Sequence, residues 1–168
     1  CGQFLASGDE GRNLVLRRRD GSEVFTKPHS RYVDTACFSA DSRRVISACW
    51  DPIVRIFDID DGSELMQLRG HSKYVNSVSC SNDGTLIASC SDDSSMRIWD
   101  ANTGDEIWKY DGHGGHVMCV RFNHDSTRVA TSCVDRSLRV FSVEERRLLH
   151  QVKAHHRAYC CAFSGDSR

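Results

Sequence analysis

The sequence predicts an all-β protein made of four-stranded antiparallel sheets, and two observations carry this prediction. The first is a histidine that returns every 42 residues, as His29, His71, His113 and His155. The second is a turn-forming cluster between successive short β-prone runs. Two aspartates and one aromatic residue keep the same interval (Asp41, Asp83 and Asp125; Asp51, Asp93 and Asp135; Phe57, Trp99 and Phe141). One supersecondary unit is therefore repeated along the chain.

The repeat divides the chain into five stretches of one domain. Three complete units cover residues 29–70, 71–112 and 113–154. Residues 1–28 form a partial, degenerate unit, and residues 155–168 begin a further one. In that last stretch Phe163 follows His155 at an interval one residue shorter than in the complete units. His155 is therefore an inexact counterpart of the earlier histidines.

Each complete unit contains four short runs with the composition of strands. In the middle unit, turn signals separate these runs at 82–84, 92–95 and 102–104. No stretch has helical periodicity. The expected strands are 33–38, 45–48, 54–57 and 65–68; 74–80, 86–89, 96–99 and 106–110; and 117–122, 129–132, 138–141 and 148–152. One such sheet buries too little apolar surface alone, so neighbouring sheets must stack, and radial stacking gives a β-propeller.

The repeated unit resembles the WD40 repeat. That pattern is Gly-His, a first strand, an Asp turn, a strand with Ser or Thr, a second Asp turn and a strand ending in Trp-Asp. The middle unit matches throughout, and its neighbours match with Phe in place of Trp. The matching residues are Gly70-His71, Ser89, Asp93 and Trp99-Asp100; Gly112-His113, Thr131, Asp135 and Phe141-Ser142; and His29, Ser47, Asp51 and Phe57-Asp58.

The resemblance implies a propeller of seven or more blades, of which this chain supplies four to five. The chain begins at Cys1 without a methionine and stops within a unit at Arg168. We therefore expect it to belong to a longer polypeptide, or to have its ring completed by blades of another chain.

The resemblance also implies a hydrogen-bonded network within each unit. A neutral His can donate from one ring nitrogen and accept at the other, and Trp can donate at the far end. Phe57 and Phe141 lack that donor, so we expect their sheets to be held less tightly. The expected network residues are His29, Ser47 and Asp51; His71, Ser89, Asp93 and Trp99; and His113, Thr131 and Asp135. A His/Ser/Asp set could suggest a hydrolase, but it recurs in every unit, so we assign no catalytic residue.

A protein-binding surface is expected on the upper rim of the central channel, again from the resemblance. Rim positions lie three and five residues after the unit His and immediately before the second turn Asp. They are Tyr32, Asp34 and Trp50; Tyr74, Asn76 and Asp92; and His116, Met118 and Val134. Trp50 is the strongest candidate because Trp is enriched at binding hot spots. The alternative interpretation is that Trp50 folds over Pro52 and shields its own turn.

The sequence assigns no cofactor and no metal. The pairs His113/His116 and His155/His156 could suggest metal binding, but His113 is needed by the network and 155–156 read as a loop. The nine cysteines form no CxxC pair and no zinc spacing. We expect buried, reduced thiols, and the even distribution of the cysteines over the units makes disulfides hard to arrange.

Charge and hydropathy argue against a protein that binds nucleic acid or spans a membrane. The formal net charge of −1 offers no field that would attract nucleic acid or an acidic membrane. The basic clusters at 17–19 and 146–147 lie beside acidic residues and are expected on solvated outer strands. The longest apolar runs are far shorter than the roughly 20 residues of a membrane span. No secretory signal opens the chain.

These observations favour a non-enzymatic interaction scaffold or adaptor, a subunit of a larger assembly that binds other proteins. The alternative is the propeller region of a larger multidomain protein, in signalling, ubiquitin-ligase substrate recognition or RNA processing, whose activity lies outside this segment. A nucleic-acid-associated propeller is a third class, which the near-neutral charge disfavours. We expect a cytoplasmic protein, with nuclear or cytoskeletal and ciliary association left open.

Overall fold

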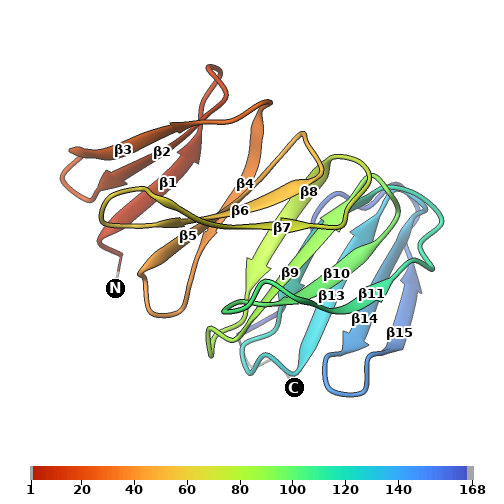
Figure 1. Cartoon of the computed structure of the whole chain (residues 1–168). Coiled ribbons are helices and arrows are strands. Elements are labelled where there is room, and N and C mark those ends of the chain that lie inside the picture. Colours follow the sequence, from red (N-terminus) through yellow and green to blue (C-terminus); the bar gives the residue numbers. More distant parts are fainter. Residues whose placement is uncertain (1, 166–168) are drawn as a thin grey trace.

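The computed structural model describes residues 2–165, and Figure 1 shows that this part of the chain consists of strands and turns. It contains no helix, and so none long and apolar enough to cross a membrane. Cys1, at the start of the first partial unit, and residues 166–168, at the end of the last, lie outside the described residues.

Three four-stranded sheets follow one another along the chain, each an antiparallel meander with its strands in sequence order. The all-β fold of four-stranded antiparallel sheets predicted from the sequence is thereby confirmed. The strands are β4 (Val33–Phe38), β5 (Arg44–Cys49), β6 (Ile53–Asp58) and β7 (Glu64–Arg69); β8 (Val75–Cys80), β9 (Leu86–Ser91), β10 (Met96–Asp100) and β11 (Glu106–Tyr110); and β12 (Val117–Phe122), β13 (Arg128–Cys133), β14 (Ser137–Ser142) and β15 (Arg147–Lys153).

The two ends of the described chain are less complete. The first sheet has three strands, β1 (Phe4–Gly8), β2 (Asn13–Arg18) and β3 (Glu23–Pro28). After β15 the chain runs as irregular backbone along β12 and β13, where the Ala158 N–H donates to the Cys133 carbonyl at 3.2 Å.

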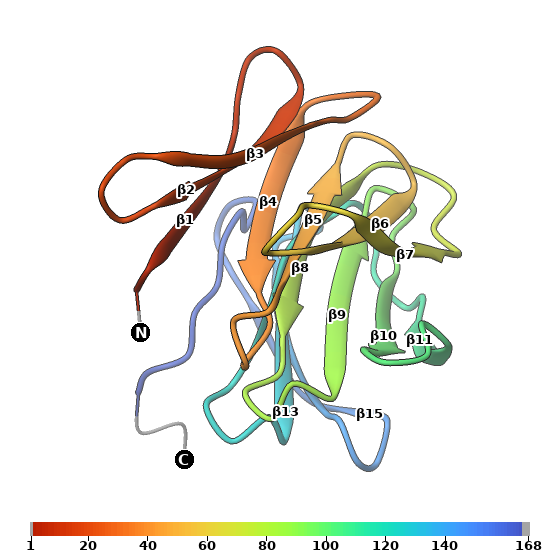
Figure 2. The same cartoon turned by 60° about the vertical axis from the view of Figure 1, so that its left-hand side comes forward.

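The sheets stack side by side through their first strands, so that β4 packs against β8 and β8 against β12 (Figure 2). Each pair of neighbouring sheets shares one apolar core, as the sequence repeat requires. Between the sheets that begin with β4 and β8, Ile46, Ile56 and Trp99 are almost fully buried. Between those that begin with β8 and β12, Met96, Ile98 and Phe141 take that place. The second strands β5, β9 and β13 are buried along almost their whole length, whereas the outer strands β7, β11 and β15 keep exposed positions.

The first repeated aspartate stabilises the turn between the first two strands of each sheet. Asp83 accepts hydrogen bonds from the Ser81 hydroxyl at 2.6 Å and the Thr85 N–H at 3.0 Å. The turn needs one residue with positive φ, which the middle unit fills with Gly84 (φ 75°). The equivalent residues in the flanking units are Ser42 and Ser126, also with positive φ. The 42-residue spacing of Asp41, Asp83 and Asp125 therefore reflects a backbone requirement.

The cysteines lie closer together than their even distribution suggested. The sulfurs of Cys37 and Cys80, on the neighbouring first strands β4 and β8, are 3.1 Å apart. Because neighbouring first strands lie side by side, cysteines of separate units meet there, although no disulfide joins the cysteines of residues 2–165. The described cysteines are free thiols. Cys160 is exposed rather than buried as predicted.

Candidate functional site: the upper rim and the network behind it

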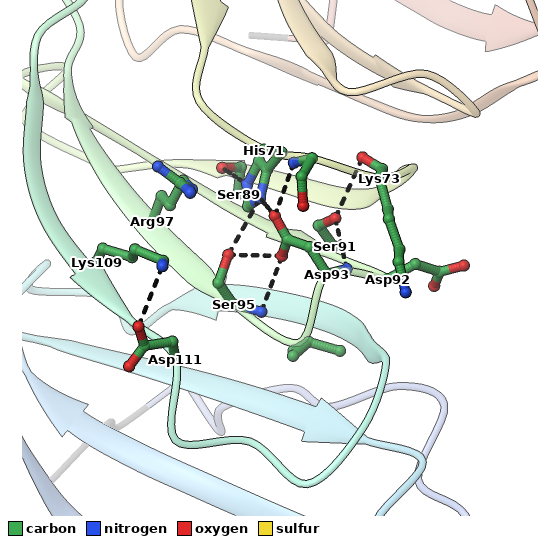
Figure 3. Close-up of polar contacts among 12 residues, drawn as sticks. His71, Lys73, Ser89, Ser91, Asp92, Asp93, Ser95, Arg97, Lys109 and Asp111 are labelled. Atoms are coloured by element: carbon green, nitrogen blue, oxygen red, sulfur yellow. Dashed lines mark hydrogen bonds and ion pairs between the residues drawn. The ribbon is translucent and has the colours of Figure 1, made fainter.

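The middle sheet contains a continuous hydrogen-bonded network (Figure 3). The His71 ring lies 2.8 Å from the Ser89 hydroxyl through Nε2 and 2.9 Å from the Asp93 carboxylate through Nδ1. Trp99 donates its indole N–H to Ser89 at 2.8 Å. Ser95 adds a hydroxyl bond to Asp93 at 2.6 Å. The four residues predicted for this unit therefore meet, and they link β9, β10, the turn between these strands and the loop before β8.

Ionisation in this network follows from burial and hydrogen bonding. Burial lowers the pKa of His71 although the adjacent Asp93 carboxylate opposes the change, so the ring is neutral near pH 7. Burial alone would raise the pKa of Asp93, but hydrogen bonds from His71 and Ser95 hold it well below its ordinary value. A neutral ring that donates from Nδ1 to an ionised Asp93 leaves Nε2 to accept the Ser89 proton. Ser89 then accepts from Trp99, and every polar atom is satisfied.

The flanking sheets keep only part of this arrangement. His29 Nε2 lies 2.8 Å from the Ser47 hydroxyl, and His113 Nε2 lies 2.9 Å from the Thr131 hydroxyl. The expected bond from His to the turn aspartate is missing there. His29 Nδ1 instead faces the Lys27 carbonyl at 3.1 Å. The predicted four-residue pattern was thus wrong for the aspartates of the two flanking units.

An arginine four residues after each turn aspartate explains the difference. Asp51 pairs with Arg55 at 2.7 Å, and Asp135 pairs with Arg139 at 2.9 Å. The middle unit has Arg97 at this position, but Arg97 pairs with Glu106 on β11. The corresponding residue on β15 is Leu148, which offers no charge, and on β7 it is Glu64, which lies 3.9 Å from Arg55, farther than Asp51. Asp93 is therefore left free to bond His71.

His113 is incompletely satisfied as a result. Its Nδ1 is buried without a hydrogen-bond partner of good geometry in residues 2–165. Burial lowers the pKa of His113 to about 4, and the nearby positive charge of Arg139 adds to this change. The ring is neutral at pH 7, and protonation would require a charge to be buried.

Three aromatic side chains lie together on the rim. Trp50 lies between the two tyrosines, 5.5 Å from the Tyr32 ring at an edge-on angle and 6.1 Å from the Tyr74 ring in a nearly parallel arrangement. Each keeps more than two fifths of its surface exposed (46%, 43% and 44% for Tyr32, Trp50 and Tyr74). These contacts support the rim interpretation of Trp50 over the alternative that it shields Pro52.

A register shift near the start of each first strand positions the next rim residues. The pairing skips Asp34 between β4 and β5, Asn76 between β8 and β9, and Met118 between β12 and β13. An extra residue of this kind leaves the ladder and its side chain is re-aimed. All three shifts fall five residues after the unit His, which explains why that position recurs on the rim.

The rim residues enclose an open hollow of about 390 Å³. Seven of the nine predicted rim residues line it: Asp34, Trp50, Tyr74, Asn76, Asp92, His116 and Met118. Tyr32 does not line the hollow but contacts Trp50, which does. Val134 is half-buried and does not line the hollow either. Figure 3 shows the neighbouring carboxylates of Asp92 and Asp93 pointing apart, with only Asp93 directed toward His71.

Asn76 differs from the expectation of an exposed rim residue. It is 6% exposed, and its amide donates to Asp92 at 2.7 Å and to the Val117 carbonyl at 2.9 Å. Since Val117 belongs to the next sheet, Asn76 joins two sheets beneath the hollow. Asn76 lines the hollow, but its contacts there are structural.

Comparison with protein families identifies this architecture. The model of the family described as WD domain, G-beta repeat matches residues 21–58, 62–100 and 104–142, which together make up more than half of the chain. The chain belongs to the WD40-repeat family. No curated protein sequence matches it significantly. WD40 repeats generally mediate protein–protein interactions, and WD40 domains are typically non-catalytic scaffolds.

Each matched WD40 stretch spans two sheets. The stretch 62–100, for example, contains β7 of one sheet and β8–β10 of the next. Consecutive repeats therefore interlock, because the outer strand of a sheet lies in the same repeat as the three inner strands of its neighbour.

Sequence reasoning missed three features of this WD40 chain. It did not identify the ion pairs of Arg55 and Arg139, although their four-residue spacing from an aspartate was a visible signal. It also missed Arg12, whose guanidinium lies 5.8 Å from the Tyr32 ring centre, and the 3.2 Å contact between His116 and Asp92.

Within residues 2–165 no cluster of His, Cys, Asp or Glu has the geometry of a metal site.

Proposed function

We propose that this WD40 chain is a non-enzymatic scaffold or adaptor, a subunit of a larger multiprotein assembly, which binds other proteins through its upper rim. The exposed ring trio of Tyr32, Trp50 and Tyr74 carries the proposal. Two sheets contribute to the trio, and its rings pack on one another instead of being covered by the chain. Large aromatic side chains held rigid at the surface are typical anchors of protein interfaces.

The buried networks support a non-catalytic assignment. Ser89 is fully buried, and its hydroxyl already accepts the Trp99 N–H and bonds His71. A serine nucleophile needs access to a substrate and a base that is free to take its proton. Although His71 accepts its hydrogen bond, Ser89 has no access to a substrate, and Thr131 is equally buried.

Charge at the rim supports a protein partner over nucleic acid. The hollow contains the carboxylates of Asp34 and Asp92 beside its aromatic rings. Carboxylates at this place would repel phosphates, whose binding depends on Lys and Arg.

A quantitative capture experiment tests the proposal. The protein and its Trp50→Ala and Tyr74→Ala variants serve as baits in a lysate, with Leu65→Ala as the matched control because Leu65 is exposed on the outer strand β7. We expect at least one partner whose recovery falls tenfold or so with both rim variants and is unchanged with Leu65→Ala. Equal recovery by all four baits would contradict the proposal.

A further inference from the structure

The rim hollow contains a carboxylate that lacks a positive partner. Asp92 is partnered by the Asn76 amide at 2.7 Å and by His116 at 3.2 Å. Asp34 has no ion pair with any Lys, Arg or His in residues 2–165. The residues that line the hollow therefore include two carboxylates, those of Asp34 and Asp92, and one basic side chain, that of His116.

The surroundings of Asp34 make a positive charge favourable there. Burial raises the pKa of Asp34, a hydrogen bond from the Trp50 side chain partly opposes this, and the negative charge of Asp92 raises it further. Asp34 is exposed in the free chain, so a partner that covers the hollow would remove water from its carboxylate, and a cation placed there would offset that loss. An acidic ligand would add like charge, and a purely apolar one would remove water from Asp34 without supplying an opposite charge.

The aromatic rings favour the same kind of ligand. The faces of Trp and Tyr rings attract ammonium and guanidinium groups through their quadrupole. This chain already shows such a contact, because the Arg12 guanidinium lies over the Tyr32 ring. Trp50 and Tyr74 line the hollow, whereas Arg12 and Tyr32 do not, and the nearly parallel rings of Trp50 and Tyr74 remain partly exposed.

We propose that the hollow binds a lysine or arginine side chain of a partner protein. The aliphatic stem lies along Trp50 and Tyr74, and the charged head meets Asp34. This inference rests on the proposed function, because it names the chemistry of the partner that the same rim recognises. Met118, which also lines the hollow, provides a soft apolar contact for the stem.

Selection from a random dodecapeptide library displayed on phage tests the inference. The wild-type protein is the bait, and peptides retained equally by Trp50→Ala are discarded. We expect the remaining peptides to share one lysine or arginine. In a synthetic copy of the best peptide, that residue is replaced by norleucine or citrulline, which keep the shape and remove the charge. The dissociation constant should rise roughly tenfold or more.

The variant Asp34→Asn provides the matched control on the protein. It keeps the size of the side chain and removes its charge. It should therefore weaken binding of the basic peptide about as much as the replacement by norleucine or citrulline does. On the Asp34→Asn background, the neutral substitution should then have little further effect, since both changes remove the same interaction. Free choline as a competitor distinguishes a basic peptide from a small quaternary ammonium ligand.

The outcomes separate the two proposals. Peptides that depend on Trp50 but share no basic residue would overturn this inference and leave the rim as a binding surface. A selection without any peptide that depends on Trp50 would contradict both. A tight complex with choline alone would show that the hollow serves a small cation instead of a protein.

Discussion

The carboxylate of Asp93 is the acidic group of the middle network and accepts four hydrogen bonds. Its two oxygens accept from His71, from the Ser72 N–H, and from both the N–H and the hydroxyl of Ser95. These donors belong to the loop before β8 and to the turn before β10. Loss of the carboxylate would leave buried donors unpaired on both segments, so Asp93 is central to the stability of the middle sheet.

The variant Asp93→Ala should therefore lower the free energy of unfolding by about 1–3 kcal/mol. Urea denaturation of the variant and the wild type measures the change. Asp111→Ala is the control, since Asp111 is 73% exposed and contacts only Lys109 among the ion pairs of the described chain. Similar midpoints for both variants would show that the network does not stabilise the fold.

The buried histidines make stability depend on pH, and His113 contributes most. Its pKa is about 4 in the folded chain, against an ordinary value of 6.5 in the unfolded chain. As the pH falls below 6.5, the unfolded state binds a proton that the folded state does not. The free energy of unfolding therefore decreases between pH 6.5 and pH 4, by up to about 3 kcal/mol from this residue.

The variant His113→Gln should flatten this pH dependence, because Gln can still bond Thr131 but does not titrate. Urea denaturation at several pH values between 7 and 4.5 measures the slope, and His156→Gln, at an exposed loop position, is the control. A slope that is equally steep in wild type and His113→Gln would refute the assignment to His113. His29 and His71, whose pKa values burial also lowers, account for a remaining slope.

At the level of strands and sheets, the aromatic residue on the third strand separates the middle sheet from its neighbours. Trp99 donates to the Ser89 hydroxyl, whereas Phe57 and Phe141 at the equivalent positions have no donor. We expect the amide protons of β9 and β10 to exchange more slowly than those of the corresponding strands β5, β6, β13 and β14.

The variant Trp99→Phe converts the middle sheet to the flanking type and should remove this difference. We expect faster exchange in β9 and β10 and a loss of about 1–2 kcal/mol of stability, from one buried hydrogen bond and some packing. Trp108→Phe, on the half-buried outer strand β11, is the control. Unchanged exchange in Trp99→Phe would mean that the indole N–H does not hold these strands.

The repeat made most of the strands predictable, but not the hydrogen bonds between them. The 42-residue interval located the strands and the rim positions because both depend on local backbone geometry. The choice between His71 and an arginine as the partner of the turn aspartate could not be predicted in this way. It depends on which carboxylate the arginine pairs with: Arg97 pairs with Glu106 across the sheet, whereas Arg55 pairs with Asp51 although Glu64 holds the position equivalent to Glu106.

Across the whole molecule, contacts between first strands hold the sheets to one another. Asn76 of β8 donates to the carbonyl of Val117 on β12, and the Val78 N–H donates to the Thr35 hydroxyl on β4 at 3.1 Å. Arg121 of β12 reaches back to the Ser77 hydroxyl at 2.8 Å. Since these bonds lie beside the rim, they also fix the relative positions of the side chains that line the hollow.

The variant Asn76→Ala should destabilise the protein by about 1–3 kcal/mol, because Asp92 and the Val117 carbonyl lose a buried donor. Thermal and urea unfolding measure the effect, with Tyr74→Ala as the exposed neighbour for comparison. An Asn76→Ala variant as stable as wild type would mean that Asn76 serves the rim surface and not the joint between sheets.

The most direct test of the account is hydrogen–deuterium exchange of the protein with and without a captured partner. We predict that the partner protects the backbone around Tyr32, Trp50, Tyr74 and His116, the segments that surround the hollow. The outer strands β7, β11 and β15 should be unchanged. Protection confined to those outer strands, with the rim segments exchanging as in the free protein, would contradict the claim that this WD40 chain binds its partners through the upper rim.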